Sequence, residues 1–209
     1  MSSPGNEENQ GEPLISVARR SIYRKWWFWV IAVPFWLFVA LLIYRLPFVL
    51  EQEKTQEVVA QIHAQKLTLA DVMGENLPPP PDPAQVDATV EGIDANGNGI
   101  RDDVELAIFK KYPNEAKIRA AELQYAKALQ MELTQVFNSE TWVAVAQKRG
   151  QGFGCVFDAL DGNTDYSKKV TEVEDLVRNT KDRKQKYSNL DAYRTSFKVL
   201  SGQDCDVGT

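Results

Sequence analysis

The sequence has a single histidine, His63, and only two cysteines among its 209 residues. A metal site built from several histidines is therefore excluded, and a Ser–His–Asp triad would have to use His63. We expect His63 to lie on the surface. Because no other combination of residues predicts catalysis, the sequence does not indicate an enzyme.

The chain also lacks the glycine patterns that bind phosphate groups. In RGQGFGC, the glycines Gly150, Gly152 and Gly154 are spaced two residues apart, which matches neither the Walker nor the dinucleotide-binding order. No strand pattern precedes them. Tight packing against another helix, or a helix break, explains these glycines better than a phosphate site.

An excess of positive charge is missing as well. The formal net charge is -5, which argues against a dedicated nucleic-acid binder, because phosphate neutralisation needs a surplus of Lys and Arg. One local basic run, RNTKDRKQK from Arg178 to Lys186, contains Asp182 and lies in a helical pattern. We interpret it as a solvent-exposed helix face, with contact to anionic lipid or an acidic partner as the alternative.

One long apolar run stands out near the N-terminus. The sequence from Trp26 to Tyr44 has no charged residue, and apolar residues resume at Leu46. At about 1.5 Å per residue such a helix crosses a hydrocarbon core of roughly 30 Å, so a transmembrane helix is predicted over residues 22–46. A cleavable signal peptide is the alternative, but its apolar region is usually about 7–15 residues long and is followed by an A-x-A-like site, which this sequence lacks.

Basic residues predict the orientation of this helix. Only Arg45 and Lys54 are basic among the residues that closely follow the span. Four basic residues precede it within a turn or two: Arg19, Arg20, Arg24 and Lys25. By the positive-inside rule the N-terminus is cytoplasmic and the C-terminal part lies outside.

Both cysteines, Cys155 and Cys205, fall in the part predicted to lie outside. In an oxidising compartment a single pair of cysteines favours a disulfide, with two buried thiols as the alternative.

Changes in composition along the sequence divide the rest of the chain into segments. Residues 1–21 are predicted to be a disordered cytoplasmic tail, because they are polar and show no apolar period. Residues 47–77 predict a stalk helix beside the membrane. LPPPPDP then ends any helix, so residues 78–91 form a proline-rich linker before a helical domain at 92–209.

The domain at 92–209 carries apolar residues at helical spacing and no alternating strand pattern, apart from the short ATVEGI. Helices are predicted from about Asp103 to before Pro113, after Pro113, after Asn138, and through the last 40 or so residues. The helix after Pro113 places one apolar face at Ile118, Ala121, Tyr125, Leu129, Leu133 and Val136. The predicted fold class is therefore all-α: one transmembrane helix and a small extracytoplasmic helical bundle.

The most informative stretch is DANGNGIRDDVE, from Asp94 to Glu105. It fills the pattern D-x-[DN]-x-[DN]-G-x5-E, in which alternating oxygens and a central glycine wrap a Ca²⁺ ion. Gly99 supplies the sharp turn. The predicted ligands are Asp94, Asn96, Asn98, the backbone carbonyl of Ile100, Asp102 and Glu105.

A turn followed by a well-capped helix is the alternative explanation of this stretch. Asp102 and Glu105 have the spacing of a capping-box pair, and Asn-Gly-Asn-Gly is a natural turn. This alternative does not explain why Asp94, Asn96 and Asn98 alternate at the spacing of metal ligands.

The stretch resembles an EF-hand loop. More closely, it is similar to GIDxNxNGxRDDVE segments that follow proline-rich linkers in exported bacterial proteins, and the following KKYPNEAKIRAAELQYAKALQ shares that similarity. The resemblance implies calcium binding, and the group provides no enzymatic activity to carry over to this chain. PDPAQVDATVEG leaves little room for an entering helix, so we expect a structural Ca²⁺ site rather than a sensor that opens a groove.

A fainter echo of the loop pattern lies at DGNTDYSKKVTE, from Asp161 to Glu172. Tyr166 replaces the glycine and Lys169 places a cation at the ninth position. We interpret this segment as a polar loop between helices, with a degenerate second site as the alternative.

Together these patterns predict a membrane-anchored calcium-binding helical module of the cell envelope, with a protein partner and no nucleic acid. The resemblance to exported bacterial proteins implies the inner membrane of a bacterium, with the domain in the periplasm. An envelope enzyme whose active site is spread over several helices is the alternative.

Overall fold

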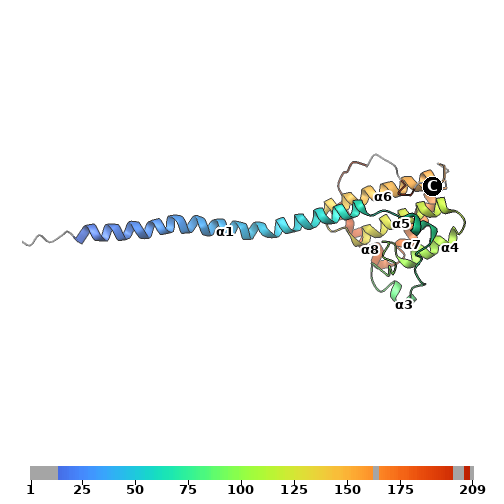
Figure 1. Ribbon diagram of the computed structural model, residues 1–209, viewed down its shortest axis with the longest axis horizontal. Helices are drawn as coiled ribbons and strands as arrows, with labels where there is room; N and C mark the ends of the chain where they lie inside the picture. The colour runs from blue at the N-terminus through green and yellow to red at the C-terminus, as the bar shows by residue number, and fades with distance from the viewer. Residues whose placement is uncertain (1–13, 162–164, 200–204, 208–209) are drawn as a thin grey trace, which may run out of the picture. The chain divides into compact units, whose positions relative to one another are not determined.

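The computed structural model describes residues 14–161, 165–199 and 205–207, and every regular element in these ranges is helical (Figure 1). The all-α prediction is thus confirmed for the described residues. The elements are α1 (Leu14–Ala64), α2 (Leu69–Met73), α3 (Pro83–Val86), α4 (Asp102–Lys111), α5 (Ala116–Thr134), α6 (Ser139–Ala159), α7 (Tyr166–Val177), α8 (Lys181–Asn189) and the 3₁₀ turn η1 (Leu190–Tyr193).

The chain divides into two compact units, Met1–Glu53 and Lys54–Thr209. In the first unit, α1 is the one described helix that is long and apolar enough to cross a membrane. Its large apolar side chains from Trp26 to Leu50 are exposed, as expected for a surface that faces lipid.

Helix α1 extends beyond both predicted ends of the span. It begins at Leu14, inside the predicted tail, and continues without a break through Pro47 to Ala64. The residues of the tail before Leu14 lie outside the described residues. A proline inside a helix removes one backbone hydrogen bond and can kink the helix without ending it, which is compatible with a helix that continues through Pro47.

The predicted stalk helix over 47–77 is instead two helices. Helix α1 ends at Ala64, and α2 begins after Thr68, whose side chain forms a capping box with Asp71. Leu67, between the two helices, is buried. The physical reason for the break is local: a Thr-x-x-Asp cap and the burial of Leu67 favour a new helix start over continuation.

Helix α5 is the centre of the second unit and contacts α2, α4, α6, α7 and α8. The apolar face predicted from sequence is confirmed, because Ala121, Tyr125, Leu129 and Leu133 are all buried. The opposite face of α5 is buried too. Its polar residues are Arg119, Glu122, Gln124, Lys127, Gln130 and Glu132.

Helix α6 begins where the sequence predicted, with Asn138 as its N-cap in a reciprocal pair with Thr141. Its glycines confirm the packing interpretation at one position. A Cβ added to Gly152 would lie 2.9 Å from the Cα of Tyr125 in α5, whereas one added to Gly150 would meet nothing within 4 Å. Gly152 therefore allows the backbones of α5 and α6 to approach closely.

The predicted disulfide is present. Cys155 of α6 and Cys205 of the C-terminal segment are bonded, with their Cα atoms 4.9 Å apart. The bond joins the C-terminal segment to the helical core, where Cys155 is buried.

Candidate functional site

The loop from Asp94 to Glu105 is folded around its own polar side chains. The carboxylate of Asp94 accepts hydrogen bonds from the backbone N–H of Asn98 (3.2 Å) and of Gly99 (2.8 Å). The side-chain oxygen of Asn98 accepts the N–H of Ile100 at 2.8 Å. Gly99 has φ +84°, a backbone conformation that glycine adopts without strain.

The C-terminal half of the loop is tied back to its first half. Asp102 Oδ1 accepts the N–H of Ala95 at 3.0 Å, and the N–H of Asp102 donates to the carbonyl of Ile93 at 2.8 Å. Glu105 Oε2 accepts a hydrogen bond from the side-chain amide of Asn96 at 3.0 Å. The side chain of Asp102 therefore stabilises the loop instead of capping α4.

The capping-box alternative is not supported by this geometry. The N-cap of α4 is Arg101, and no side chain caps its first turn. Asp102 and Glu105 lie in the first turn, where carboxylates favour the positive end of the helix dipole.

Two carboxylates of the loop are buried, with Asp102 and Glu105 each 1% exposed. Burial raises the pKa of Asp102 more than the hydrogen bond from Ala95 lowers it, and neighbouring Asp94 adds to the rise. Burial also raises the pKa of Glu105 to about 7, although the amide of Asn96 opposes this shift. Both carboxylates would be stabilised by a positive charge in the loop.

One oxygen of the loop has no donor. Asp102 Oδ2 is fully enclosed and makes no hydrogen bond to any described residue. An enclosed carboxylate oxygen without a partner is costly, by about 1–3 kcal/mol or more for a charged group. A proton on this oxygen, or a cation bound to it, would compensate for the missing hydrogen-bond donor.

The donor set fits Ca²⁺ in its chemistry. Among the described residues, no group of three or more His, Cys, Asp or Glu side chains is placed to hold a metal ion. The loop instead mixes carboxylates with amide and carbonyl oxygens, which are the hard ligands that Ca²⁺ prefers. The residues that would hold the ion are Asp94, Asn96, Asn98, Ile100, Asp102 and Glu105.

Segments before the loop lie against it without forming an entering helix of ordinary length. Helix α3 has four residues, and turns and bends connect it to Asp94. From the other side, the carbonyl of Asn76, just after α2, accepts a hydrogen bond from the amide of Asn96 at 2.9 Å.

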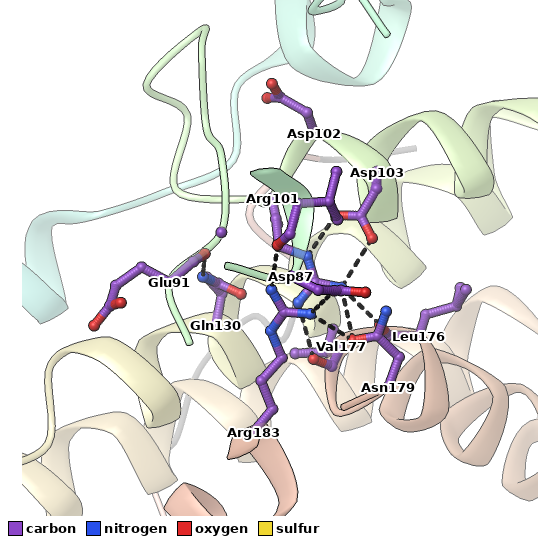
Figure 2. Close-up of polar contacts among 12 residues, drawn as sticks. Asp87, Glu91, Arg101, Asp102, Asp103, Gln130, Leu176, Val177, Asn179 and Arg183 are labelled. Carbon is purple, nitrogen blue, oxygen red and sulfur yellow. Dashed lines mark hydrogen bonds and ion pairs between the residues drawn. The ribbon is translucent and has the colours of Figure 1, made fainter. Parts of the chain in front are cut away.

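Arg101, within the loop, anchors it to α7. Its guanidinium donates to the carbonyls of Leu176 (2.9 Å) and Val177 (3.1 Å) at the C-terminal end of that helix, and it pairs with Asp103. Asp102, the next residue, points away from these contacts (Figure 2). Adjacent residues thus serve different purposes: Arg101 fixes the loop to the core, and Asp102 faces the loop interior.

Arg183 of α8 anchors the segment that leads to the loop (Figure 2). It is fully buried and donates to the carbonyls of Val86 (2.7 Å), Thr89 (3.1 Å) and Val90 (3.0 Å), and it pairs with Asp87 at 2.6 Å. The interpretation of the basic run 178–186 as a solvated face is therefore wrong at this position. It is also wrong at Arg178, which is buried and pairs with Glu132 at 2.8 Å.

Lys127 of α5 connects the loop to the end of α1. A Cβ added to Gly99 would lie 3.2 Å from Cε of Lys127, and the Lys127 ammonium donates to the carbonyl of Lys66 at 2.9 Å. Sequence reasoning missed both Lys127 and Arg183, because a buried, partnered cation looks like a surface cation in a sequence pattern.

The fainter echo at Asp161–Glu172 lies partly outside the described residues. Two of its three described carboxylates pair with lysines of other helices: Asp161 with Lys117 at 3.3 Å, and Glu172 with Lys111. The interpretation as a polar loop between helices holds at Asp161 and Asp165, and it is wrong from Tyr166 on, where α7 begins.

A groove of about 340 Å³ lies between α6 and α7, lined by residues that include Arg149, Phe153, Glu174 and Phe197. Its ionisable groups are engaged within the protein. Arg149 pairs with Glu132 at 2.9 Å, and Glu174 accepts the hydroxyl of Tyr125 at 2.8 Å.

A scan against protein-family models finds no match, and no curated protein or solved structure matches the chain.

Proposed function

We propose that this protein is a membrane-anchored module of a bacterial cell envelope, with a structural Ca²⁺ site at the loop Asp94–Glu105. Its helical unit lies in the periplasm and serves protein interaction. The observation that carries the calcium assignment is the enclosed Asp102 Oδ2, which has no donor among the described residues and lies in a loop with Glu105 and four further oxygen-bearing positions.

The anchor is the part of α1 from Trp26 onward, which is apolar enough to span a membrane, and four basic residues of the same helix precede that part. The positive-inside rule then places the second unit outside the cytoplasm, and the inner membrane of a bacterium is the setting that fits. The Cys155–Cys205 disulfide supports that side of the membrane, because disulfides persist in oxidising compartments.

The role of the ion is structural in this proposal. When bound, Ca²⁺ supplies the positive charge that the buried carboxylates of Asp102 and Glu105 lack. Arg101 holds the same loop against the end of α7. The side-chain amide of Asn96 donates a hydrogen bond to the carbonyl of Asn76, just after α2. These fixed contacts favour a site that stabilises one geometry over a site that opens a groove.

Partner binding is proposed from the exposed aromatic residues of the helical unit. Phe153 and Phe157 of α6 are each 41% exposed, and they pack edge-on against Tyr166. Exposed aromatic side chains are enriched at protein interfaces. Cross-linking in intact cells should recover a reproducible protein neighbour from the intact chain and lose it in a Phe153→Ser and Phe157→Ser variant.

Calcium-dependent unfolding of the full-length chain in detergent tests the site. We expect millimolar Ca²⁺ to raise the melting temperature relative to EDTA, and Asp102→Asn to abolish this rise, because the ligand charge is removed. Asp175→Asn, which removes an exposed carboxylate on α7, is the matched control and should retain the full rise. An equal calcium effect on both variants would rule out the assigned loop.

A further inference from the structure

Two buried lysines hold the segment at which α1 ends. Lys148 donates to the carbonyl of Gln65 at 2.8 Å, and Lys127 donates to the carbonyl of Lys66 at 2.9 Å. Lys127 is 7% exposed and Lys148 is 8% exposed. Cations at this position suit the negative end of a helix, where carbonyls lack partners within the helix.

The C-terminal segment supplies the carboxylate of this cluster. Asp206 Oδ2 accepts the backbone N–H of Leu67 at 3.0 Å, and the N–H of Asp206 donates to Gln124 of α5 at 2.8 Å. Asp206 therefore contacts both the chain that leaves α1 and the central helix.

Asp206 also favours the charged form of the two lysines. Burial lowers the pKa of Lys127 and of Lys148, and the charge of Asp206 opposes that shift in both. Lys127 has further support from Asp71 and Asp94. The charge of Lys66 disfavours the charged form of Lys148. The charged form of Lys148 therefore depends more on Asp206 than that of Lys127 does.

The position of Asp206 follows from its neighbour in the chain. Cys205 is bonded to Cys155 of α6, and Val207 packs against the hydrophobic core. The covalent bond therefore keeps Asp206 beside Leu67, Lys127 and Lys148.

We propose that the Cys155–Cys205 disulfide is a redox-sensitive latch that holds Asp206 on the end of α1 and releases it when a dithiol reduces the bond. This latch does not depend on calcium binding. As a consequence, the oxidation state of the envelope sets how strongly Asp206 holds the segment that follows α1.

The exchange reaction balances with a dithiol as reductant. One thiolate attacks Sγ of Cys205, the less buried of the two cysteines, and Cys155 leaves as a thiolate that takes up a proton. The second thiol of the reductant then displaces Cys205 as a thiol. The products are two protein thiols and the disulfide of the reductant, so two electrons and two protons are transferred.

Hydrogen exchange of the full-length chain in detergent tests the latch. After reduction with dithiothreitol, the amides of residues 65–68 should exchange at least tenfold faster, whereas those in the middle of α5 should change much less. Asp206→Ala in the oxidised protein removes the acceptor for the Leu67 N–H and leaves the disulfide intact, so it should give the same local acceleration. Asp175→Ala, which removes an exposed carboxylate on α7, should leave these amides unchanged.

Two results would overturn the latch. The first is unchanged exchange at residues 65–68 in protein whose two thiols are both accessible to labelling, or in oxidised Asp206→Ala. The second is an equal acceleration throughout α5, which would mean that the disulfide stabilises the whole unit and has no special relation to α1.

Discussion

Gly152 of α6 lies directly against the backbone of Tyr125 in α5, so that a methyl group at Gly152 would come within 2.9 Å of the Cα of Tyr125. Gly152→Ala should therefore force the two helices apart and destabilise the helical unit by about 1–3 kcal/mol, the usual cost of overpacking. Gly150→Ala is the matched control, because that position is open. It should raise stability by about 0.5–1 kcal/mol through helix propensity. Urea unfolding measures both, and equal effects of the two substitutions would contradict the packing.

The sequence predicted some of this fold for clear physical reasons. Apolar spacing at Tyr125, Leu129 and Leu133 identified one face of α5, and the Asn138 cap identified the start of α6. Periodicity could not show that the other face of α5 is buried as well, because its polar residues obtain their partners from distant segments. The bond from Gln130 to the carbonyl of Glu91 is one such contact.

The candidate site divides in the same way. The alternation of Asp94, Asn96 and Asn98 is a local pattern, and a local pattern is visible in sequence. The anchoring of the loop by Arg101 depends on α7, which is more than seventy residues away along the chain. Contacts of that kind require the folded structure, and so do the buried positions of Arg183 and Lys127.

Arg183 should be intolerant of its closest chemical replacement. Arg183→Lys keeps the charge but cannot reach several carbonyls and the carboxylate of Asp87 together, because the ammonium lacks the planar fork of a guanidinium. Arg183 is fully buried although Asp87 is 53% exposed, and a hydrogen bond to a charged group contributes about 1.5–3 kcal/mol, so we expect a loss of about 2–3 kcal/mol. Lys184→Arg, at an exposed neighbour, is the control and should be neutral. Urea unfolding measures the loss of stability, and hydrogen exchange measures the loosening of residues 86–91. Unchanged exchange rates at residues 86–91 in Arg183→Lys would refute the role of Arg183 in holding this segment.

Glu122 should make stability depend on pH. It is 1% exposed, and burial raises its pKa above the ordinary value although Tyr112 and Lys111 oppose the shift. As pH rises above about 4.5, Glu122 loses its proton in the unfolded chain but keeps it in the folded protein, because its pKa is raised there. The unfolded state is therefore favoured, and the free energy of unfolding falls as pH rises.

The variant Glu122→Gln isolates this effect from other carboxylates. Its amide does not ionise, so its stability relative to the unmodified protein should increase as pH rises from 4 towards 7. Urea unfolding in EDTA at several pH values measures that difference. A difference that is constant with pH would show that Glu122 does not titrate with a raised pKa.

Isothermal titration calorimetry of the full-length chain with Ca²⁺ tests the central claim most directly. We predict one ion per chain with a dissociation constant of about 10⁻⁴ to 10⁻³ M, as in extracellular calcium modules, and loss of binding in Glu105→Gln. Asp175→Asn should bind as the unmodified protein does. The absence of heat at millimolar Ca²⁺, or unchanged binding in Glu105→Gln, would contradict a calcium site in the loop Asp94–Glu105.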